Sequence, residues 1–434
     1  MPQSESGIDG ACGSQPPETV PNVVFRVGRT MRMKLNKSGQ LMLAAAASLV
    51  AASLLTACNQ LTGTLTVDFV YVTCAKAAGP YNYGEVDVFE IDSESGKMRQ
   101  IPSSPFPSGG RNPVAEAVSS DQTNLYVVNQ DDNSIVQFVI GNDGKLYPQN
   151  TVNTPGIFPL ATAVGGKTLF VADTYQPLPT CSPAAPCPGS IAAYPINSDD
   201  SLGTPFTDSS ISANYWPLIL PSSPTDVVTP TSIAVMPGGA SVYVAAYDST
   251  SNAGYVFGFA VGSGSLTPLN GGVPFNVGTH PAAITSDPTG SYLYVVDQSA
   301  NNIQGFSVTS SGLSPLSGSP FATGNKPDAI TIDAKGKFAY VANAQDSTVT
   351  GYTINSGALT KIANYPLGTQ PVAIGIDPAM NQFLFTANFL GNTVNGFEID
   401  ATTGTLLNSQ FSPYSASANP TAVAAIPHGA VANQ

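Results

Sequence analysis

Acid–base chemistry needs ionisable side chains in unusual surroundings, and one glutamate in this sequence occupies such a place. Seven prolines recur along the chain, and the third residues after them are Glu116, Thr162, Ile233, Ile284, Ile330, Ile374 and Val423. Glu116 is therefore an acid at a mostly aliphatic position, where lost hydration raises a carboxyl pKa unless a cation such as Arg111 compensates. We expect Glu116 to act as a base or to anchor a ligand. A glutamate whose carboxylate simply reaches water is the structural alternative.

The residue before each of these prolines forms a second, mostly polar series. Its members are Asn112, Phe158, Thr229, His280, Lys326, Gln370 and Asn419. If the prolines open equivalent strands, this series forms one ring in space. We expect His280 to take part in catalysis with Glu116, and Lys326 to orient an anionic or carbonyl group. The other members expected to bind the ligand are Asn112 and Gln370, together with the neighbouring Arg111.

Other catalytic and metal-binding motifs are absent or are explained by turns. The sequence has no Gly-x-Ser-x-Gly motif, and its two histidines, His280 and His428, make a His-Cys zinc site implausible. The acidic stretch 131–133 lacks the other ligands of a calcium loop. Asp287 and Asp377 begin Asp-Pro turns, in which the carboxylate caps backbone N–H groups. We therefore expect neither a metal nor a cofactor.

A repeated strand pattern must position these residues. An uninterrupted apolar strand recurs seven times, at residues 69–72, 125–128, 169–172, 242–245, 293–296, 339–342 and 384–387. Because its side chains do not alternate, this strand is expected to be central in its sheet and covered on both faces. Each copy is followed by a second strand, a tight turn, an outer strand and a proline-led strand. The pattern predicts an all-β fold, a seven-bladed β-propeller of four-stranded antiparallel blades.

The two ends of the repeat complement each other. The first unit lacks a proline-led strand, and residues 420–425 supply one that no central strand follows. Joining the two would close the ring and remove its open sheet edges. We therefore predict that the C-terminal strand completes the first blade.

Long connections point to a working face. They fall at residues 73–83, 173–189, 204–229 and 247–253, and we assign all of them to one face of the disc. Loops on a rigid scaffold collect binding residues, so this face is expected to bind a small molecule or a protein. Tyr215 and Trp216 lie in one of these connections and are expected to bind the ligand. A simple cap over the propeller is the alternative.

The N-terminal part of the chain predicts export. Basic residues at 32, 34 and 37 precede an apolar run, 41–57, that is shorter than a membrane-spanning helix of roughly 20 residues. The run ends in Leu-Thr-Ala-Cys58, which resembles the lipobox of bacterial lipoproteins. This resemblance implies that Cys58 carries a lipid and anchors the protein to a membrane of the cell envelope. The predicted segments are an extension or over-called start (1–30), a signal peptide (31–57), a tether (58–66), the propeller (67–427) and a tail (428–434).

Charge and cysteine content narrow the partners further. The net charge is −13, with 15 basic side chains, so a basic surface for nucleic acid is not expected. A monomer is expected. Cys181 and Cys187 bracket a short proline-containing loop and are expected to form a disulfide in an oxidising compartment. Two free thiols are the alternative, because spacing alone does not establish bridging geometry.

The repeat also resembles a known family. Tyr-Val-(Ala/Val)-Asn/Asp strands are followed by Asn-x-Val-x-Gly-Phe-like strands and Pro-x-x-Ile-x-x-Asp-Pro-x-Gly segments. Over residues 67–427 these resemble YVTN-repeat propellers and the related seven-bladed lactonases, whose named activity is 6-phosphogluconolactonase. That family has a Gly-Pro-Arg-His motif and a glutamate after a Tyr-Val strand. The nearest segment here is 278–283, with His280, and the Tyr-Val strands end in Asp297, Asn343 and Asn388.

Three classes of function remain. An exported, lipid-anchored propeller that binds a ligand at the cell envelope is expected first. The resemblance implies the alternative, a lactonase-like hydrolase that acts on a lactone outside the cytoplasm. Another enzyme is the third class, because a propeller fold alone does not define a reaction.

Overall fold

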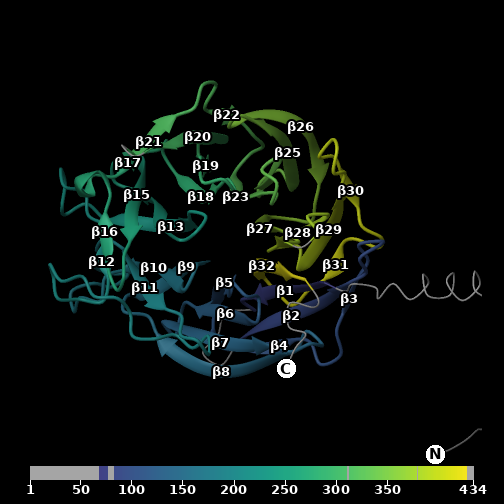
Figure 1. Ribbon diagram of the computed structural model, residues 1–434, viewed down its shortest axis with the longest axis horizontal. Helices are drawn as coiled ribbons and strands as arrows, with labels where there is room; N and C mark the ends of the chain where they lie inside the picture. Colours follow the sequence, from purple (N-terminus) through teal and green to yellow (C-terminus); the bar gives the residue numbers. More distant parts are fainter. Residues whose placement is uncertain (1–67, 77–82, 310–311, 379, 428–434) are drawn as a thin grey trace, which may run out of the picture. The chain divides into compact units, whose positions relative to one another are not determined.

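This computed structural model describes residues 68–76, 83–309, 312–378 and 380–427. The strands in these ranges form seven antiparallel sheets. Each sheet is one blade, and the blades surround a common axis (Figure 1). The signal peptide, Cys58, the tether and the tail predicted above lie outside the described residues. Within the described residues, no helix has the length and apolarity needed to cross a membrane.

The inner strand of each blade begins at or just before one of the seven prolines. In order around the ring, from blade 1 to blade 7, the inner strands are β32 (Pro420–Ile426), β5 (Pro113–Val118), β9 (Ile157–Gly165), β13 (Val228–Val235), β18 (Pro281–Ser286), β23 (Pro327–Ile332) and β27 (Pro371–Ile376). Each inner strand contacts the inner strands of the two neighbouring blades, so the seven form a closed ring.

The central and third strands follow in each blade. The central strands are β1 (Asp68–Cys74), β6 (Asn124–Asn129), β10 (Thr168–Tyr175), β14 (Ser241–Asp248), β19 (Tyr292–Asp297), β24 (Phe338–Asn343) and β28 (Phe383–Asn388). The third strands are β2 (Tyr83–Ile91), β7 (Ser134–Ile140), β11 (Ser190–Pro195), β15 (Ala253–Val261), β20 (Asn302–Thr309), β25 (Thr348–Asn355) and β29 (Thr393–Ile399).

The outer strands are less regular, and four of them are split. They are β3 (Met98–Gln100) with β4 (Phe106–Arg111), β8 (Leu146–Asn153), β12 (Trp216–Pro217), β16 (Leu266–Pro268) with β17 (Phe275–Asn276), β21 (Gly312–Pro315) with β22 (Phe321–Ala322), β26 (Ala358–Pro366), and β30 (Leu406–Asn408) with β31 (Tyr414–Ser415). A short 3-10 helix, η1 (Asn270–Gly272), fills the break in blade 4. The predicted seven-bladed architecture is therefore confirmed.

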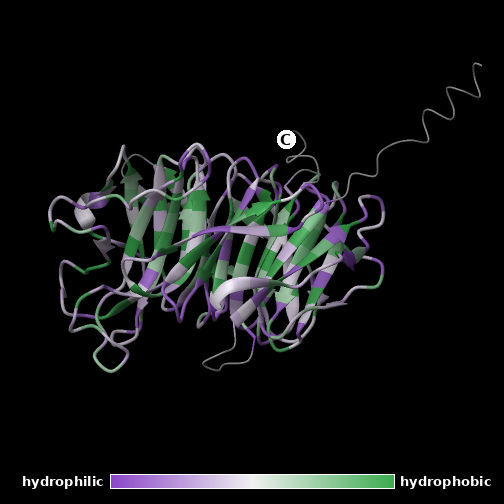
Figure 2. Ribbon diagram, turned by 90° about the horizontal axis from the view of Figure 1, so that it is seen from below, coloured by the Kyte–Doolittle hydropathy of each residue, from purple (hydrophilic) through white to green (hydrophobic). Residues whose placement is uncertain are grey.

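The central strands form the core between blades. β1, β6, β24 and β28 are buried along their whole length, as their lack of alternation predicts. Figure 2 shows apolar residues along the strands, while more hydrophilic residues are common in the connections. Four tyrosines of these strands are fully buried, so their hydroxyls need hydrogen-bond partners inside the protein: Tyr71, Tyr126, Tyr294 and Tyr340. Tyr71 donates to the Gly144 carbonyl in the next blade's turn, and Tyr340 does the same to Gly404.

Where an outer strand is broken, some backbone N–H groups of the third strand have no partner in a neighbouring strand. Serine hydroxyl groups accept these N–H groups instead. Ser104, Ser319 and Ser412 each stand at such a break, in blades 1, 5 and 7. Their hydroxyl oxygens accept the backbone N–H groups of Val88, Gly305 and Gly396, respectively. These bonds avoid the cost, about 1–3 kcal/mol, of leaving a buried donor unpaired.

The predicted placement of the long connection 204–229 is wrong in part. Phe206 donates its N–H to Ala193 of the third strand, and Trp216 pairs with Ile191 of the same strand. Residues 207–215 are therefore an excursion within the outer strand, at the rim of the disc. Trp216 is only 3% exposed and packs in the core between blades 3 and 4. It borders a mainly apolar pocket of about 190 Å³ at this rim, away from the face where the loops were expected to bind.

Ring closure occurs where it was predicted. β32 pairs antiparallel with β1, from Phe69 opposite Ile426 to Cys74 opposite Pro420. The Thr421 hydroxyl adds bonds to the carbonyls of Thr73 and Pro113, which belong to blades 1 and 2. The last strand of the chain thus joins the first blade to the second.

Deleting residues 420–434 should open blade 1, because β1 would lose its pairing partner and its apolar cover. We expect the melting temperature to fall by about 10 °C or more, since 1 kcal/mol shifts the midpoint of a large domain by roughly 2–4 °C. Circular dichroism melts of the mature protein would measure this. Deletion of 428–434 alone, which keeps β32, is the control. Equal melting of the two truncated proteins would contradict closure through β32.

Candidate functional site

One set of backbone positions is the same in all seven blades and brings the predicted ring residues to one face. In every inner strand the pairing register shifts directly after the proline. The residue before the proline and the bulged residue after it therefore stand where the inner strand starts. We call the seven residues before the prolines the mouth ring. They lie on the face formed by the outer-to-inner and central-to-third connections, which we call the loop face.

The mouth ring has an unusual backbone. Five of its members adopt positive φ: Asn112 (52°), Phe158 (56°), Lys326 (54°), Gln370 (57°) and Asn419 (57°). Asparagines in the preceding blade hold three of these turns by accepting their N–H groups. Asn133 accepts from Phe158, Asn301 from Lys326, and Asn392 from Asn419, at 2.7 to 2.8 Å. Neighbouring blades therefore fix the mouth ring together.

The acids and amides that end the central strands support the mouth structurally. Asp297 accepts the backbone N–H groups of Thr279, His280, Ser299 and Ala300. Such a carboxylate ties the start of one inner strand to the turn beside it. Asn343 and Asn388 are likewise buried and hydrogen-bonded within their own blades. Of these positions after the Tyr-Val strands, Asp297 and Asn343 thus hold backbone N–H groups, and Asn388 bonds to neighbouring side chains.

The Asp-Pro turns behave as predicted. Asp287 accepts the N–H groups of Thr289 and Tyr292, and Asp377 accepts those of Met380 and Gln382. Their carboxylates cap backbone donors at the tight turns between inner and central strands. These turns lie on the opposite face from the mouth ring.

A cluster of functional side chains does form on the loop face, between blades 4, 5 and 6. The His280 imidazole stacks on the Tyr247 ring, with centroids 4.0 Å apart and planes 24° apart. The Gln298 amide donates to an Asp328 carboxylate oxygen at 2.7 Å. The ammonium of Lys326 is exposed and lies close enough to influence both His280 and Asp328 electrostatically. We call these five residues the mouth cluster.

Electrostatics prepare the mouth cluster for chemistry near neutral pH. Burial raises the pKa of Asp328 to about 6, although Lys326 and the hydrogen bond from Gln298 oppose the rise. Burial lowers the pKa of His280, and Lys326 lowers it further against the opposing effect of Asp297. At pH 7 the site therefore combines an ionised carboxylate, which can accept a proton, with a neutral imidazole, which can donate or accept a hydrogen bond.

Sequence reasoning found part of this cluster and missed the rest. His280 and Lys326 were predicted together, and the structure brings them close. Tyr247, Gln298 and Asp328 were missed. A signal for Asp328 was present, because it is the only acid among the residues directly after the seven prolines. Those residues are Val114, Leu160, Thr231, Ala282, Asp328, Val372 and Thr421.

Glu116 lies elsewhere, at the seam that closes the ring. One carboxylate oxygen accepts the Thr73 hydroxyl of β1 and the Ala424 N–H of β32. The other oxygen is buried and has no hydrogen-bond partner. Burial raises the pKa of Glu116 to about 8, only partly offset by those two bonds. Glu116 therefore contacts blade 1, whereas the mouth cluster is built from blades 4 to 6.

Arg111 does not offset the burial of Glu116, so the pKa of this carboxyl is raised, as expected in the absence of a compensating cation. Arg111 forms an ion pair with Asp132 at 2.5 Å and also donates to the Asp131 carbonyl. The Asn112 amide donates to Gln130 and to Asp131. Gln370 lies in the mouth ring, and its carbonyl accepts the Phe389 N–H. Roles for Arg111, Asn112 and Gln370 in ligand binding stay predictions, as does catalysis by Glu116.

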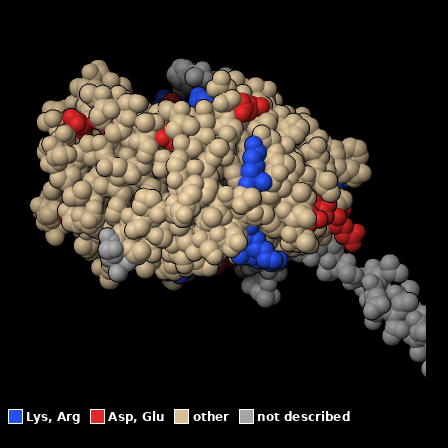
Figure 3. Space-filling model, turned by 90° about the horizontal axis from the view of Figure 1, so that it is seen from above, with Lys and Arg blue, Asp and Glu red and all other residues tan. Residues whose placement is uncertain are grey.

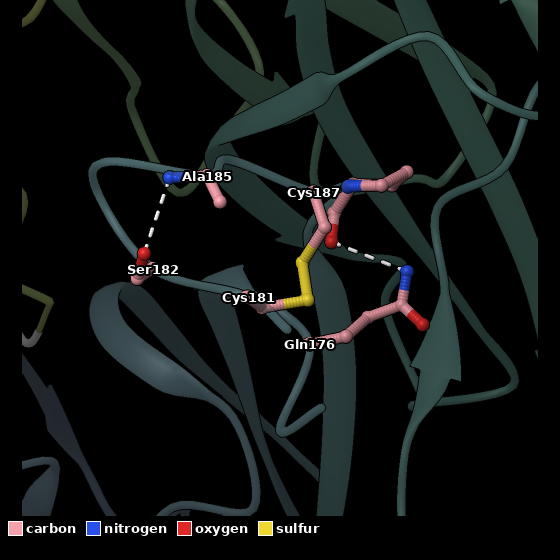
Figure 4. Close-up of a disulfide and its surroundings, with 6 residues drawn as sticks. Gln176, Cys181, Ser182, Ala185 and Cys187 are labelled. Carbon is pink, nitrogen blue, oxygen red and sulfur yellow. Dashed lines mark hydrogen bonds between the residues drawn. A yellow bond between two sulfur atoms is a disulfide. The ribbon is translucent and has the colours of Figure 1, made fainter. Parts of the chain in front are cut away.

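The predicted cysteine pair lies in the central-to-third connection of blade 3, on the loop face. Cys181 and Cys187 form a disulfide, with Cα atoms 5.5 Å apart (Figure 4). Within this loop Ala185 donates to Ser182, and the Gln176 amide donates to the Pro188 carbonyl. The remaining described cysteine, Cys74, is buried and reduced.

Ligand binding by Tyr215 and Trp216 stays a prediction, with both side chains now placed in the core.

These blades and their closure define the protein as a seven-bladed β-propeller. Comparison with known proteins indicates which family of propellers it resembles. The family model "Lactonase, 7-bladed beta-propeller" matches residues 82–176 and 309–424. The predicted resemblance to the seven-bladed lactonase family is therefore confirmed. No curated protein matches the chain at a significant level.

Solved structures share the fold at low sequence identity. One is a candidate 6-phosphogluconolactonase from Bacteroides fragilis, with a TM-score of 0.64 and 18% identity over 84% of this chain and 99% of that one. Another is the periplasmic gluconolactonase of Pseudomonas aeruginosa, with a TM-score of 0.65 and 17% identity over 83% of this chain and 99% of that one. At such identities the likeness establishes the fold alone.

Replacing Glu116 by glutamine should change how stability depends on pH. A carboxyl whose pKa rises from 4.5 to about 8 on folding stabilises the folded state below pH 4.5, and this contribution is lost as pH rises towards 8. Glutamine resembles the protonated form and does not titrate. Glu116→Gln should therefore gain stability relative to wild type between pH 5 and 8, in urea melts at several pH values.

The matched control is Glu94→Gln, at an exposed turn of the same blade that Glu116 contacts. It should show the wild-type pH dependence. A constant stability difference between Glu116→Gln and wild type from pH 5 to 8 would show that Glu116 is already ionised in the folded protein.

Proposed function

We propose that this protein hydrolyses a lactone at the mouth cluster, outside the cytoplasm. The observation that carries the proposal is the convergence of Asp328, His280 and Lys326 from two neighbouring strand starts, those of β18 and β23. These residues supply a base, a neutral hydrogen-bonding group and a cation, which are the groups that ester hydrolysis uses. The lactonase family match supports the same reaction class.

The reaction assigns one role to each group. Asp328 accepts a proton from a water molecule as the water oxygen bonds to the lactone carbonyl carbon. Lys326 stabilises the negative charge that forms on the carbonyl oxygen. The bond between the carbonyl carbon and the ring oxygen then breaks, and the ring oxygen takes up the proton that Asp328 holds, which gives the hydroxyl of a hydroxy acid and restores the Asp328 carboxylate. Gln298 orients Asp328, and Tyr247 orients His280 beside the ring oxygen.

The charges around the mouth ring favour a substrate without a phosphate. Arg111 is paired with Asp132, and Lys76 is paired with Glu85 at 2.7 Å. Lys326 is the cation that the mouth cluster itself supplies. A phosphate dianion is usually held by several cationic or N–H donors, so an uncharged or singly charged lactone fits these surroundings better. Figure 3 shows the side of the propeller rather than its mouth, and charged side chains are sparse there as well.

Export and lipid anchoring at Cys58 complete the proposal. The signal-peptide layout before Cys58 supports them, and a disulfide between Cys181 and Cys187 suits an oxidising compartment. The periplasmic location in the name of the Pseudomonas aeruginosa gluconolactonase is consistent with a lactonase propeller working outside the cytoplasm.

Changing Asp328 to asparagine should abolish most turnover. Removal of a general base typically costs about 10²-fold or more in rate, so kcat against a panel of lactones should fall by at least that factor. The wild-type kcat/KM should rise as pH increases through about 6, where the Asp328 carboxyl ionises. Hydrolysis followed by pH indicator, with buffer blanks, would measure both effects.

Asp226→Asn is the control for Asp328→Asn. Asp226 lies in an outer-to-inner connection on the same face, and its backbone N–H bonds to Ser223. This variant should keep wild-type activity, and both variants should keep the wild-type melting temperature. Hydrolysis that survives Asp328→Asn would remove Asp328 from the mechanism.

A second function, binding without turnover, has one observation in its favour. The positions after the Tyr-Val strands, where the lactonase family places a glutamate, hold Asp297, Asn343 and Asn388, and these side chains bond to backbone and neighbouring side chains. In that case the protein would be a binding module of the cell envelope. Lactone binding to wild type with no product over hours would favour it over hydrolysis.

Cys58→Ser tests the anchor separately. Without the thiol no lipid can be attached, so the protein should be released from membranes or remain unprocessed. Membrane fractionation and the mass of the N-terminal peptide would show this. Normal processing together with unchanged membrane association would contradict an anchor at Cys58.

A further inference from the structure

Phe158 is a strained residue in the mouth ring. Its φ of 56° is in the left-handed region, where a bulky side chain is a genuine outlier. The equivalent positions in blades 2 and 1 hold Asn112 and Asn419, a residue type that tolerates this conformation. A phenylalanine here costs backbone free energy, and such strain is concentrated at functional sites.

The backbone bonds at this position do not need a phenyl ring. The Phe158 N–H is accepted by Asn133 at 2.7 Å, and its carbonyl accepts the Thr174 hydroxyl at 2.7 Å. Both bonds use main-chain atoms that asparagine would also provide. The side chain is half-buried and contacts the Tyr175 ring edge-on, with centroids 6.3 Å apart. The backbone bonds therefore do not require an aromatic side chain, and the ring contact of Phe158 is with another aromatic residue of the loop face, Tyr175.

The surroundings of Phe158 are apolar on the loop face. Tyr175 ends the central strand of blade 3 and leads into the disulfide-bonded loop, where Leu178 is 42% exposed. Tyr247, in the next blade, is the member of the mouth cluster that stacks on His280. Aromatic side chains therefore lie at the loop-face ends of strands in blades 3 and 4, and the polar groups of the mouth cluster follow in blades 5 and 6.

We propose that Phe158 and Tyr175 form an apolar subsite that receives an alkyl or aryl substituent of the substrate. The assignment of this substrate as a lactone rests on the proposed function. The lactone ring lies at the mouth cluster, and its substituent extends over Tyr247 towards blade 3. The chemical class is therefore a lactone with an apolar side chain rather than a fully hydroxylated sugar lactone.

Binding tests the subsite without any need for turnover. The two probes are γ-butyrolactone and γ-decalactone, which share a ring and differ by a hexyl chain, and calorimetry at pH 5, where spontaneous opening is slow, gives their Kd values. Wild type should bind γ-decalactone at least about 10-fold more tightly, because each buried CH₂ contributes about 0.8 kcal/mol and 1.4 kcal/mol is tenfold. Equal Kd values for the two probes would overturn the subsite.

Phe158→Asn is the decisive variant, because asparagine keeps the left-handed backbone used in blades 1 and 2. It should reduce the preference for γ-decalactone to about 2-fold or less while leaving the Kd for γ-butyrolactone unchanged, since the hexyl chain loses its apolar contact. The matched control is Leu390→Asn, which removes an exposed apolar side chain from the same face of blade 7. A preference that survives Phe158→Asn, or that Leu390→Asn removes equally, would also overturn the subsite.

The two proposals fail in different ways. If wild type binds γ-decalactone selectively but releases no hydroxy acid, the hydrolase proposal fails and the subsite stands. If wild type hydrolyses lactones and Phe158→Asn changes neither the Kd ratio nor the KM ratio, the subsite fails and the hydrolase proposal stands. Asp328→Asn should lower kcat for both probes without altering the Kd ratio.

Discussion

The pairing of β32 with β1 is the interaction on which the other features depend. A propeller blade offers hydrogen-bonding edges at its inner and outer strands, and an open ring would leave the first blade without an inner strand. Pairing from Phe69 to Cys74 removes that defect and holds the inner strands in a closed circle. Only in a closed circle do the seven strand starts face one another, so the mouth ring exists because the chain ends meet.

Contacts between successive blades carry this constraint around the ring. Tyr71 and Tyr340 send their hydroxyls to a turn in the next blade, and the turn glycines leave room for the aromatic residues packed there. A Cβ on Gly404 would lie 2.3 Å from the Phe338 ring, and its φ of 71° already favours glycine. Equivalent contacts between blades occur on the loop face, where backbone N–H groups of the next blade donate to Asn133, Asn301 and Asn392. Each blade therefore sets the position of its neighbour at both faces.

The acidic residues of this propeller differ in how many hydrogen-bond donors each carboxylate accepts. Asp297 accepts several backbone N–H groups, so it is occupied in holding turns. Glu116 is buried at the seam with one oxygen unpartnered, and its surroundings favour the protonated form. Asp328 accepts from one amide and lies beside a cation, so it is ionised at neutral pH and can still exchange protons. Position in a repeat thus matters less for chemistry than the number of donors that each carboxylate already has.

The sequence by itself determined the blades, because strand patterning and turn residues are local and each is repeated seven times. Apolar runs without alternation, prolines at strand starts and an orphan final strand were enough for the architecture and its closure. His280 and Lys326 were also within reach, since the repeat aligns them. The tertiary structure alone decided that Arg111 pairs with Asp132, that Trp216 belongs to an outer strand, and that Asp328 joins His280. These outcomes depend on contacts between blades and on loop paths, which no repeat encodes, because they are set by whichever side chain the neighbouring blade presents.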